Sequence, residues 1–184
     1  SMDEAVAGFA TRIEVELHED CAVTIRDNGR GIPIDPHPKF PDKSALEVIF
    51  CTLHAGGKFG GHAYQTSGGL HGVGASVVNA LSDSLFVQVA KNKELYEQRF
   101  SRGHPLGGLK KLGPTQNRRG TSVTFHADPE IFGKHQFKPT RLFKSIRSKA
   151  YLFSGVEIRW KSAIDDGQTP KLATFHFPGG LSDY

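Results

Sequence analysis

The chain has 184 residues, a formal net charge of +4, 38% hydrophobic residues and 23% charged residues. This length suits one domain, 1–184, with a substantial core, and no apolar run approaches the roughly 18 residues that a membrane-spanning helix needs. The N-terminus lacks the features of a signal peptide, and the two cysteines are too few for a disulfide framework. We therefore expect a cytoplasmic domain without a membrane partner. Its scattered basic residues are weak support for a nucleotide or DNA partner.

The first half of the chain predicts a short helix, a hairpin, a loop and two helices. Residues 2–10 have helical spacing, whereas residues 12–27 alternate between apolar and polar about a polar turn, which predicts two strands with one buried face. Glycine and four prolines make 28–43 a predicted loop. The segment SALE, at 44–47, is a capping box that predicts a helix through about Leu53. A glycine-rich stretch then precedes a helix expected from Gly72 to Leu81.

The second half predicts paired strands, one long helix and two closing strands. Strands are expected near 84–90 and 95–100, followed by a Gly/Pro-rich loop to 120 and the strand TSVTFHA at 121–127. Pro139 suits the first turn of a helix whose buried stripe contains Leu142, Ile146 and Ala150. The segments GVEIRW and LATFHF predict the closing strands. The pattern is that of a mixed α/β layer fold without internal repeats.

Asp27 is unusual because it shares a strand face with the core-like positions 21, 23 and 25. A buried carboxylate needs a donor, and Thr121 also points inward because it shares its strand face with Val123 and Phe125. One interpretation is a strand-end aspartate that only shapes the following turn. The other is a pocket for adenine, whose amine donates to Asp27 while a ring nitrogen accepts from Thr121, directly or through water. Guanine would instead place a carbonyl oxygen against the carboxylate.

The stretch SGGLHGVG, at 67–74, carries four glycines in seven positions before a predicted helix. Free N–H groups at a helix start favour phosphate, so this stretch is either a phosphate loop or a flexible connector. It matches neither a P-loop nor a Rossmann fingerprint. His71 is a candidate acid or base, although its backbone N–H is the better candidate contact. No other histidine or cysteine has metal-ligand spacing.

The segments DNGRGIP, LHAGGKF, SGGLHGVG and GT (120–121) together resemble the GHKL ATPases. Specifically, the whole chain is similar to the ATPase domain of the B subunits of bacterial type IIA topoisomerases. The closing GGLSDY, the FSRG loop and Gln65 favour the topoisomerase IV branch over the gyrase branch. The resemblance implies the GHKL (Bergerat) ATP-binding fold, a two-layer α/β (α+β) sandwich in which helices cover one face of a mixed, mostly antiparallel sheet.

The resemblance also implies roles for individual residues. Asp27 would bind the adenine amine, Thr121 and the Gly31 backbone would hold a water, and Arg30 would pair with Glu4 at the pocket rim. Glu97, with Arg99 on the same strand face, would stand where gyrases often place an arginine beside the adenine. The base would be walled by Ile25, Ile32 and Pro33. Phosphates would be bound by Lys58 and the backbone of Leu70, His71, Gly72, Val73 and Gly74, with about 54–72 acting as a lid.

The function implied is ATP binding and hydrolysis that drive DNA strand passage. The longer protein would use Mg²⁺, dimerise when it binds ATP, and work with DNA and the A subunit of topoisomerase IV. The family's catalytic glutamate and Mg²⁺-binding asparagine align upstream of Ser1, and its transducer domain follows residue 184. No catalytic or metal residue is therefore assigned, and we expect a monomeric chain that binds ATP or competitive inhibitors without hydrolysing ATP. The alternatives are a gyrase B ATPase domain, another GHKL ATPase, and a non-hydrolysing nucleotide- or nucleic-acid-binding module.

Overall fold

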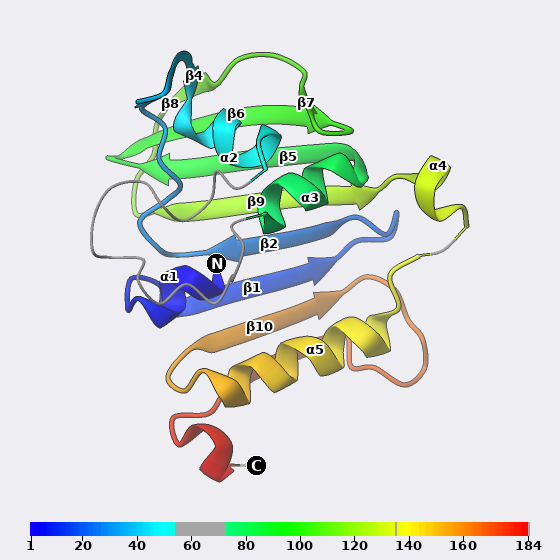
Figure 1. The fold of residues 1–184 in the computed structure, drawn as a ribbon. Coiled ribbons are helices and arrows are strands. Elements are labelled where there is room, and N and C mark those ends of the chain that lie inside the picture. The colour runs from blue at the N-terminus through cyan, green and yellow to red at the C-terminus, as the bar shows by residue number, and fades with distance from the viewer. Residues whose placement is uncertain (54–72, 135, 184) are drawn as a thin grey trace.

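The computed structural model describes residues 1–53, 73–134 and 136–183. A nine-stranded sheet carries helices on one face (Figure 1). Its strand order is β11-β10-β1-β2-β9-β5-β6-β7, and β8 also pairs with β6. Strands β1 and β10 are parallel, and the other described pairs of this sheet are antiparallel. The expected two-layer α/β sandwich is thus confirmed. The strands are β1 (Arg12–Leu17), β2 (Val23–Asp27), β5 (Ser82–Lys91), β6 (Glu94–Ser101), β7 (His104–Pro105), β8 (Lys110–Pro114), β9 (Gly120–Ala127), β10 (Glu157–Ser162) and β11 (Leu172–His176).

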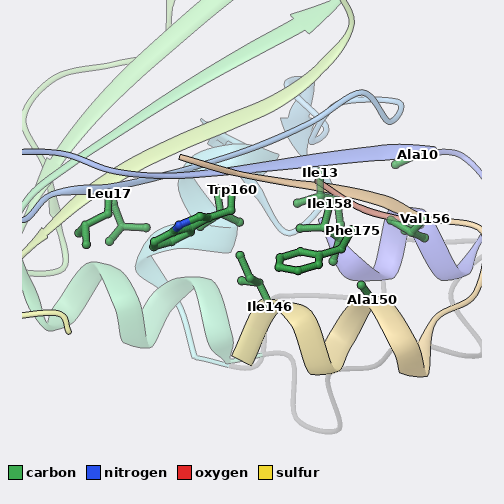
Figure 2. Packing of buried hydrophobic residues seen from close by; sticks show 12 residues of the cluster. Ala10, Ile13, Leu17, Ile146, Ala150, Val156, Ile158, Trp160 and Phe175 are labelled. Carbon is green, nitrogen blue, oxygen red and sulfur yellow. The ribbon is translucent and has the colours of Figure 1, made fainter. Parts of the chain in front are cut away.

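The helices stabilise the sheet through two hydrophobic clusters. In the first, Ile13 and Leu17 of β1 pack with Ile146 and Ala150 of α5, so the predicted helix stripe is confirmed (Figure 2). The second cluster lies beneath α2 and α3 and joins Leu46 and Phe50 to the buried side chains of β5. Phe125 of β9 packs against both clusters. The helices are α1 (Met2–Val6), α2 (Ala45–Cys51), α3 (Gly74–Ala80), α4 (Pro129–Phe132), α5 (Pro139–Leu152) and the 3₁₀ turn η2 (Gly180–Asp183).

Ser44 caps α2 as the sequence predicts, because its side chain accepts from the Glu47 backbone N–H at 3.1 Å. The Glu47 carboxylate, however, accepts from Gln98 Nε2 on β6 at 2.8 Å. The motif therefore both begins the helix and attaches it to the sheet. The helix ends at Cys51, two residues before the predicted end.

Two segments predicted as loops contain strands. Within 28–43 the structure forms β3 (Pro36–His37) and most of β4 (Phe40–Ser44), which make a separate two-stranded sheet. Within 103–119 it forms β7 and β8, and β8 is almost entirely exposed. Exposed edge strands bury no face, so their sequences lack the alternation that reveals a strand. None of the described helices has the length and apolarity to cross a membrane.

Candidate functional site

Asp27 is the last residue of β2 and is 5% exposed. Its Oδ1 accepts from the backbone N–H of Gly29 at 3.0 Å and of Thr121 at 3.3 Å. Its Oδ2 accepts from the Ser1 hydroxyl at 2.7 Å. The prediction that Asp27 points inward and meets donors is therefore confirmed. The Ser1 amino nitrogen also lies 3.8 Å from Oδ2, and because a carboxylate oxygen has two acceptor positions, Oδ2 accepts one hydrogen bond here and can accept a second.

Thr121 lies beside Asp27, on β9, and is 6% exposed. Its Oγ1 accepts from the Ile32 backbone N–H at 3.0 Å. That bond uses an acceptor position of the hydroxyl, so the O–H hydrogen is available to donate. The site thus presents a carboxylate acceptor and a hydroxyl donor next to each other, linked by the bond between the Thr121 N–H and Asp27.

Two glycines, Gly120 and Gly31, allow β9 to lie close to the end of β2 and the turn after Asp27 to lie close to β5. Gly120 has φ +105°, and a Cβ there would lie 2.1 Å from the Asp27 carbonyl oxygen. Gly31 has φ +83°, and a Cβ there would lie 2.9 Å from Cγ1 of Val89. Both backbone conformations are ones that side chains disfavour. The glycines of the GT and DNGRG motifs are therefore required by close contact between β2, β5 and β9.

The predicted pair of Glu4 and Arg30 is present. Arg30 Nη2 donates to Glu4 Oε1 at 2.7 Å, and the Arg30 backbone N–H donates to Oε2 at 2.9 Å. The guanidinium also lies over the Phe9 ring, 3.5 Å from its centroid. These contacts attach α1 to the turn that follows Asp27.

The three predicted wall residues, Ile25, Ile32 and Pro33, are each partly buried. Ile25 packs against the first hydrophobic cluster and Ile32 against the second, so the Asp27 site lies where the two clusters meet. The predicted phosphate-binding residues are only partly described. Val73 caps α3 and Gly74 is its first residue, whereas Lys58, Leu70, His71, Gly72 and the lid segment 54–72 lie outside the described residues.

Glu97 and Arg99 share one face of β6, as the sequence predicts. Glu97 pairs with Gln88 of β5 and is flanked by Gln98, which is buried on the helix side of β6. Side chains alternate along a strand, so Glu97 lies on the sheet face opposite the helices. Arg99 shares that face and lies over the Phe86 ring, 4.4 Å from its centroid. Glu97 and Arg99 therefore project from the sheet face opposite the Asp27 side chain.

Four hydrogen bonds at the site were missed from the sequence. The Ser1 hydroxyl reaches Asp27, and Asn28 Oδ1 accepts from the Thr11 and Arg12 backbone N–H groups at 2.9 and 3.0 Å. Arg119 Nε donates to the Asn28 carbonyl oxygen at 2.8 Å. Asn28 belongs to the DNGRG motif, and Arg119 directly precedes the GT motif. Their partners lie elsewhere in the chain, so local patterns could not assign them.

Residues 1–131 match the family described as histidine kinase-, DNA gyrase B-, and HSP90-like ATPase. The chain therefore belongs to this ATPase family. It is 58% identical to the B subunit of DNA topoisomerase 4 from Bartonella bacilliformis, over 100% of this chain and 27% of that protein. It is 47% identical to the B subunit of DNA gyrase from Thermotoga maritima, over 100% of this chain and 28% of that protein.

Among solved structures, the chain is similar to the 43K ATPase domain of Thermus thermophilus gyrase B in complex with an aminocoumarin. The TM-score is 0.83 and the identity 39%, over 99% of this chain and 44% of that one. The fold and the family resemblance inferred from the motifs are thus confirmed. The chain spans about a quarter of the length of the topoisomerase relatives it matches, 27% for the Bartonella protein.

Proposed function

We propose that this chain is the ATP-binding part of a topoisomerase IV B subunit, in which ATP binding and hydrolysis drive DNA strand passage. The observation that carries the proposal is the buried pair of Asp27 and Thr121, an acceptor beside a donor. The particular branch is supported by the identity of 58%, along the whole chain, to the Bartonella topoisomerase 4 protein. A gyrase B subunit is the second candidate, supported by the 47% identity to the Thermotoga protein.

Adenine fits the hydrogen-bonding pattern of this pair. Its exocyclic amine donates to Asp27 Oδ2, and its ring nitrogen accepts from the Thr121 hydroxyl, directly or through a water held by the Gly31 backbone. Guanine presents a carbonyl oxygen where the amine would be, which places acceptor against acceptor. The same pair that binds adenine therefore excludes guanine, and the flanking Ile25, Ile32 and Pro33 supply apolar contact for the ring.

The remaining assignments extend this site. The Glu4–Arg30 pair borders the base, and Val73 and Gly74 at the start of α3 continue the predicted phosphate loop, to which Lys58, Leu70, His71 and Gly72 belong. Mg²⁺ would accompany ATP in the longer protein. Among the described residues no group of three His, Cys, Asp or Glu side chains gathers to hold a metal.

The partners of the longer protein follow from the same proposal. They are DNA, the A subunit of topoisomerase IV and a second B subunit that associates when ATP binds, within a bacterial cytoplasm. Adenine-site inhibitors are further ligands, because they need Asp27, Thr121 and the rim rather than a metal. The gyrase B structure that this chain resembles contains an aminocoumarin, which makes this inhibitor class a natural probe.

The test is a calorimetric titration of the chain with non-hydrolysable analogues of ATP and GTP, each with and without Mg²⁺. We expect saturable binding of the ATP analogue and at least tenfold weaker binding of the GTP analogue, because one ionic hydrogen bond is lost. Aminocoumarins should raise the unfolding temperature. Equal affinity for the two nucleotides, or no binding of any adenine-site ligand, would refute the proposal.

A further inference from the structure

A second concave site lies on the sheet face opposite the helices. Its cavity has a volume of about 680 Å³ and is lined by β1, β2, β9 and residues of the 92–93 and 115–119 loops. The strand register aligns Glu14, Arg26, Ser122 and Gln88 across four neighbouring strands. These positions alternate with the buried ones, so their side chains project away from the nucleotide site. The volume falls within the range of small-ligand sites, about 300–1,000 Å³.

The cavity lining is strongly cationic. Five of its residues are basic and two are acidic, namely Arg12, Arg26, Lys93, Arg118, Arg119, Glu14 and Asp27. The Asp27 carboxylate is used on the helix side of the sheet, by donors from Gly29, Thr121 and Ser1. Glu14 is the remaining lining carboxylate. It is shared by Arg12 at 3.5 Å and Arg26 at 3.6 Å, and Arg159 also lies 3.9 Å away.

Arg118 is one of the lining cations whose charge no described carboxylate compensates. It is partly buried, and its Nη2 donates to the neutral Gln88 Oε1 at 3.1 Å. Among the described residues, no carboxylate lies within 4.0 Å of its guanidinium. Burial lowers the pKa of Arg118 below the usual arginine value, and repulsion from Arg26 lowers it further. The Arg26 and Arg118 guanidiniums thus line one cavity, and the one lining carboxylate on this face, Glu14, pairs with Arg26 but not with Arg118; an anion would stabilise this arrangement.

We propose that this cavity binds a phosphate-bearing anion, with Arg26 and Arg118 as its main ligands. Guanidinium groups match phosphate oxygens in planar, two-point contacts. A single carboxylate would compensate one guanidinium, whereas a phosphate group carries enough charge and oxygen atoms for both. The side chains of Thr115 and Asn117 in the same lining add neutral donors. The lining includes Asp27 and Thr121 of the proposed adenine site, but Arg26 and Ser122 project from the opposite face of the sheet, and neither proposal depends on the other.

The experiment is a titration of the chain with inorganic pyrophosphate at about 0.15 M salt, followed by NMR of the arginine side-chain N–H groups. We expect saturable shifts at Arg26 and Arg118, and about tenfold weaker binding in Arg118→Gln, because a charge-assisted hydrogen bond is removed. The matched control is Arg141→Gln on α5, whose side chain is exposed and outside the cavity. It should bind pyrophosphate like the wild type.

A further variant separates an anion site from a merely solvated basic surface. Glu14→Gln removes the carboxylate that competes with a bound anion for Arg12 and Arg26. Pyrophosphate should therefore bind several-fold more tightly to this variant. If Glu14 only stabilises the fold, its loss would not increase the affinity for pyrophosphate. A short DNA duplex tests the source of the phosphate. If the duplex displaces pyrophosphate and loses affinity in Arg118→Gln, the phosphate is that of a nucleic-acid backbone; if it does not, the ligand is a free phosphate compound. No saturable shift at Arg118, or equal weakening by Arg141→Gln, overturns the proposal.

Discussion

Asp27→Asn provides the sharpest test of how the base is recognised. In the wild type, Oδ1 accepts two backbone N–H groups and Oδ2 accepts the Ser1 hydroxyl. The asparagine carbonyl must replace Oδ1, because the opposite orientation would place its NH₂ against the N–H groups of Gly29 and Thr121. The NH₂ then occupies the Oδ2 position. There it can donate to the Ser1 oxygen, but it faces the adenine amine as donor against donor.

The magnitude follows from the one bond that the ligand loses. A hydrogen bond to a charged group contributes about 1.5–3 kcal/mol, and each 1.4 kcal/mol changes affinity about tenfold. We therefore expect Asp27→Asn to weaken binding of an ATP analogue by about 10- to 100-fold. The internal bonds are retained in neutral form, so the loss of folding stability should be about 1 kcal/mol, which corresponds to roughly 2–4 °C in unfolding temperature.

The assay is calorimetry with ATP and ITP analogues, with thermal unfolding as the control for folding. Hypoxanthine carries a carbonyl oxygen in place of the amine, so it suits the amide introduced by Asp27→Asn better than it suits the wild-type carboxylate. The preference for ATP over ITP should consequently fall at least tenfold in the variant. An unchanged ATP affinity in a folded variant, or an unchanged ATP/ITP preference, would remove Asp27 from the adenine site.

Three further predictions concern stability and reactivity. Gly120→Ala places a Cβ 2.1 Å from the Asp27 carbonyl oxygen, at a φ of +105°. The substitution should cost about 3 kcal/mol of folding stability, which lowers the unfolding temperature by about 6–12 °C. The control is Gly113→Ala, where φ is +125° but nothing lies within 4 Å of the new Cβ, and its unfolding temperature should fall by less. Two threonine hydroxyls and two backbone N–H groups hold the pKa of Asp166 well below its usual value. This carboxylate therefore stabilises the fold above the ordinary aspartate pKa, and in urea unfolding the deficit of Asp166→Asn at pH 7 should shrink as the pH falls below about 4. Burial raises the pKa of the Cys51 thiol from 9.0 to about 11, which leaves less of the reactive thiolate at pH 8. Alkylation of Cys51 at pH 8, followed by mass spectrometry, should therefore be on the order of 100-fold slower in the folded chain than in the unfolded chain. Equal alkylation rates would contradict this prediction.

The sequence predicted the parts of the fold that bury one face. Strict alternation in β1 and the stripe on α5 made those elements visible, and the same parity identified Asp27 as an inward carboxylate. The exposed strand β8 was missed because it buries no face. Strand parity puts Gln98, and not Glu97, on the helix side of β6, and the family resemblance alone did not indicate this.

The contacts within the site show why its polar groups are ordered before a ligand binds. Asp27 is held by donors from three separate segments, which are its own turn, the start of β9 and the residue before α1. Thr121 is held by the Ile32 N–H, and Arg30 by two oxygens of Glu4. A ligand that enters such a site orders few additional side chains, so less of its interaction energy is spent on conformational entropy. Changes that loosen α1, such as loss of the Glu4–Arg30 pair, should therefore reduce affinity by disordering the turn that follows Asp27.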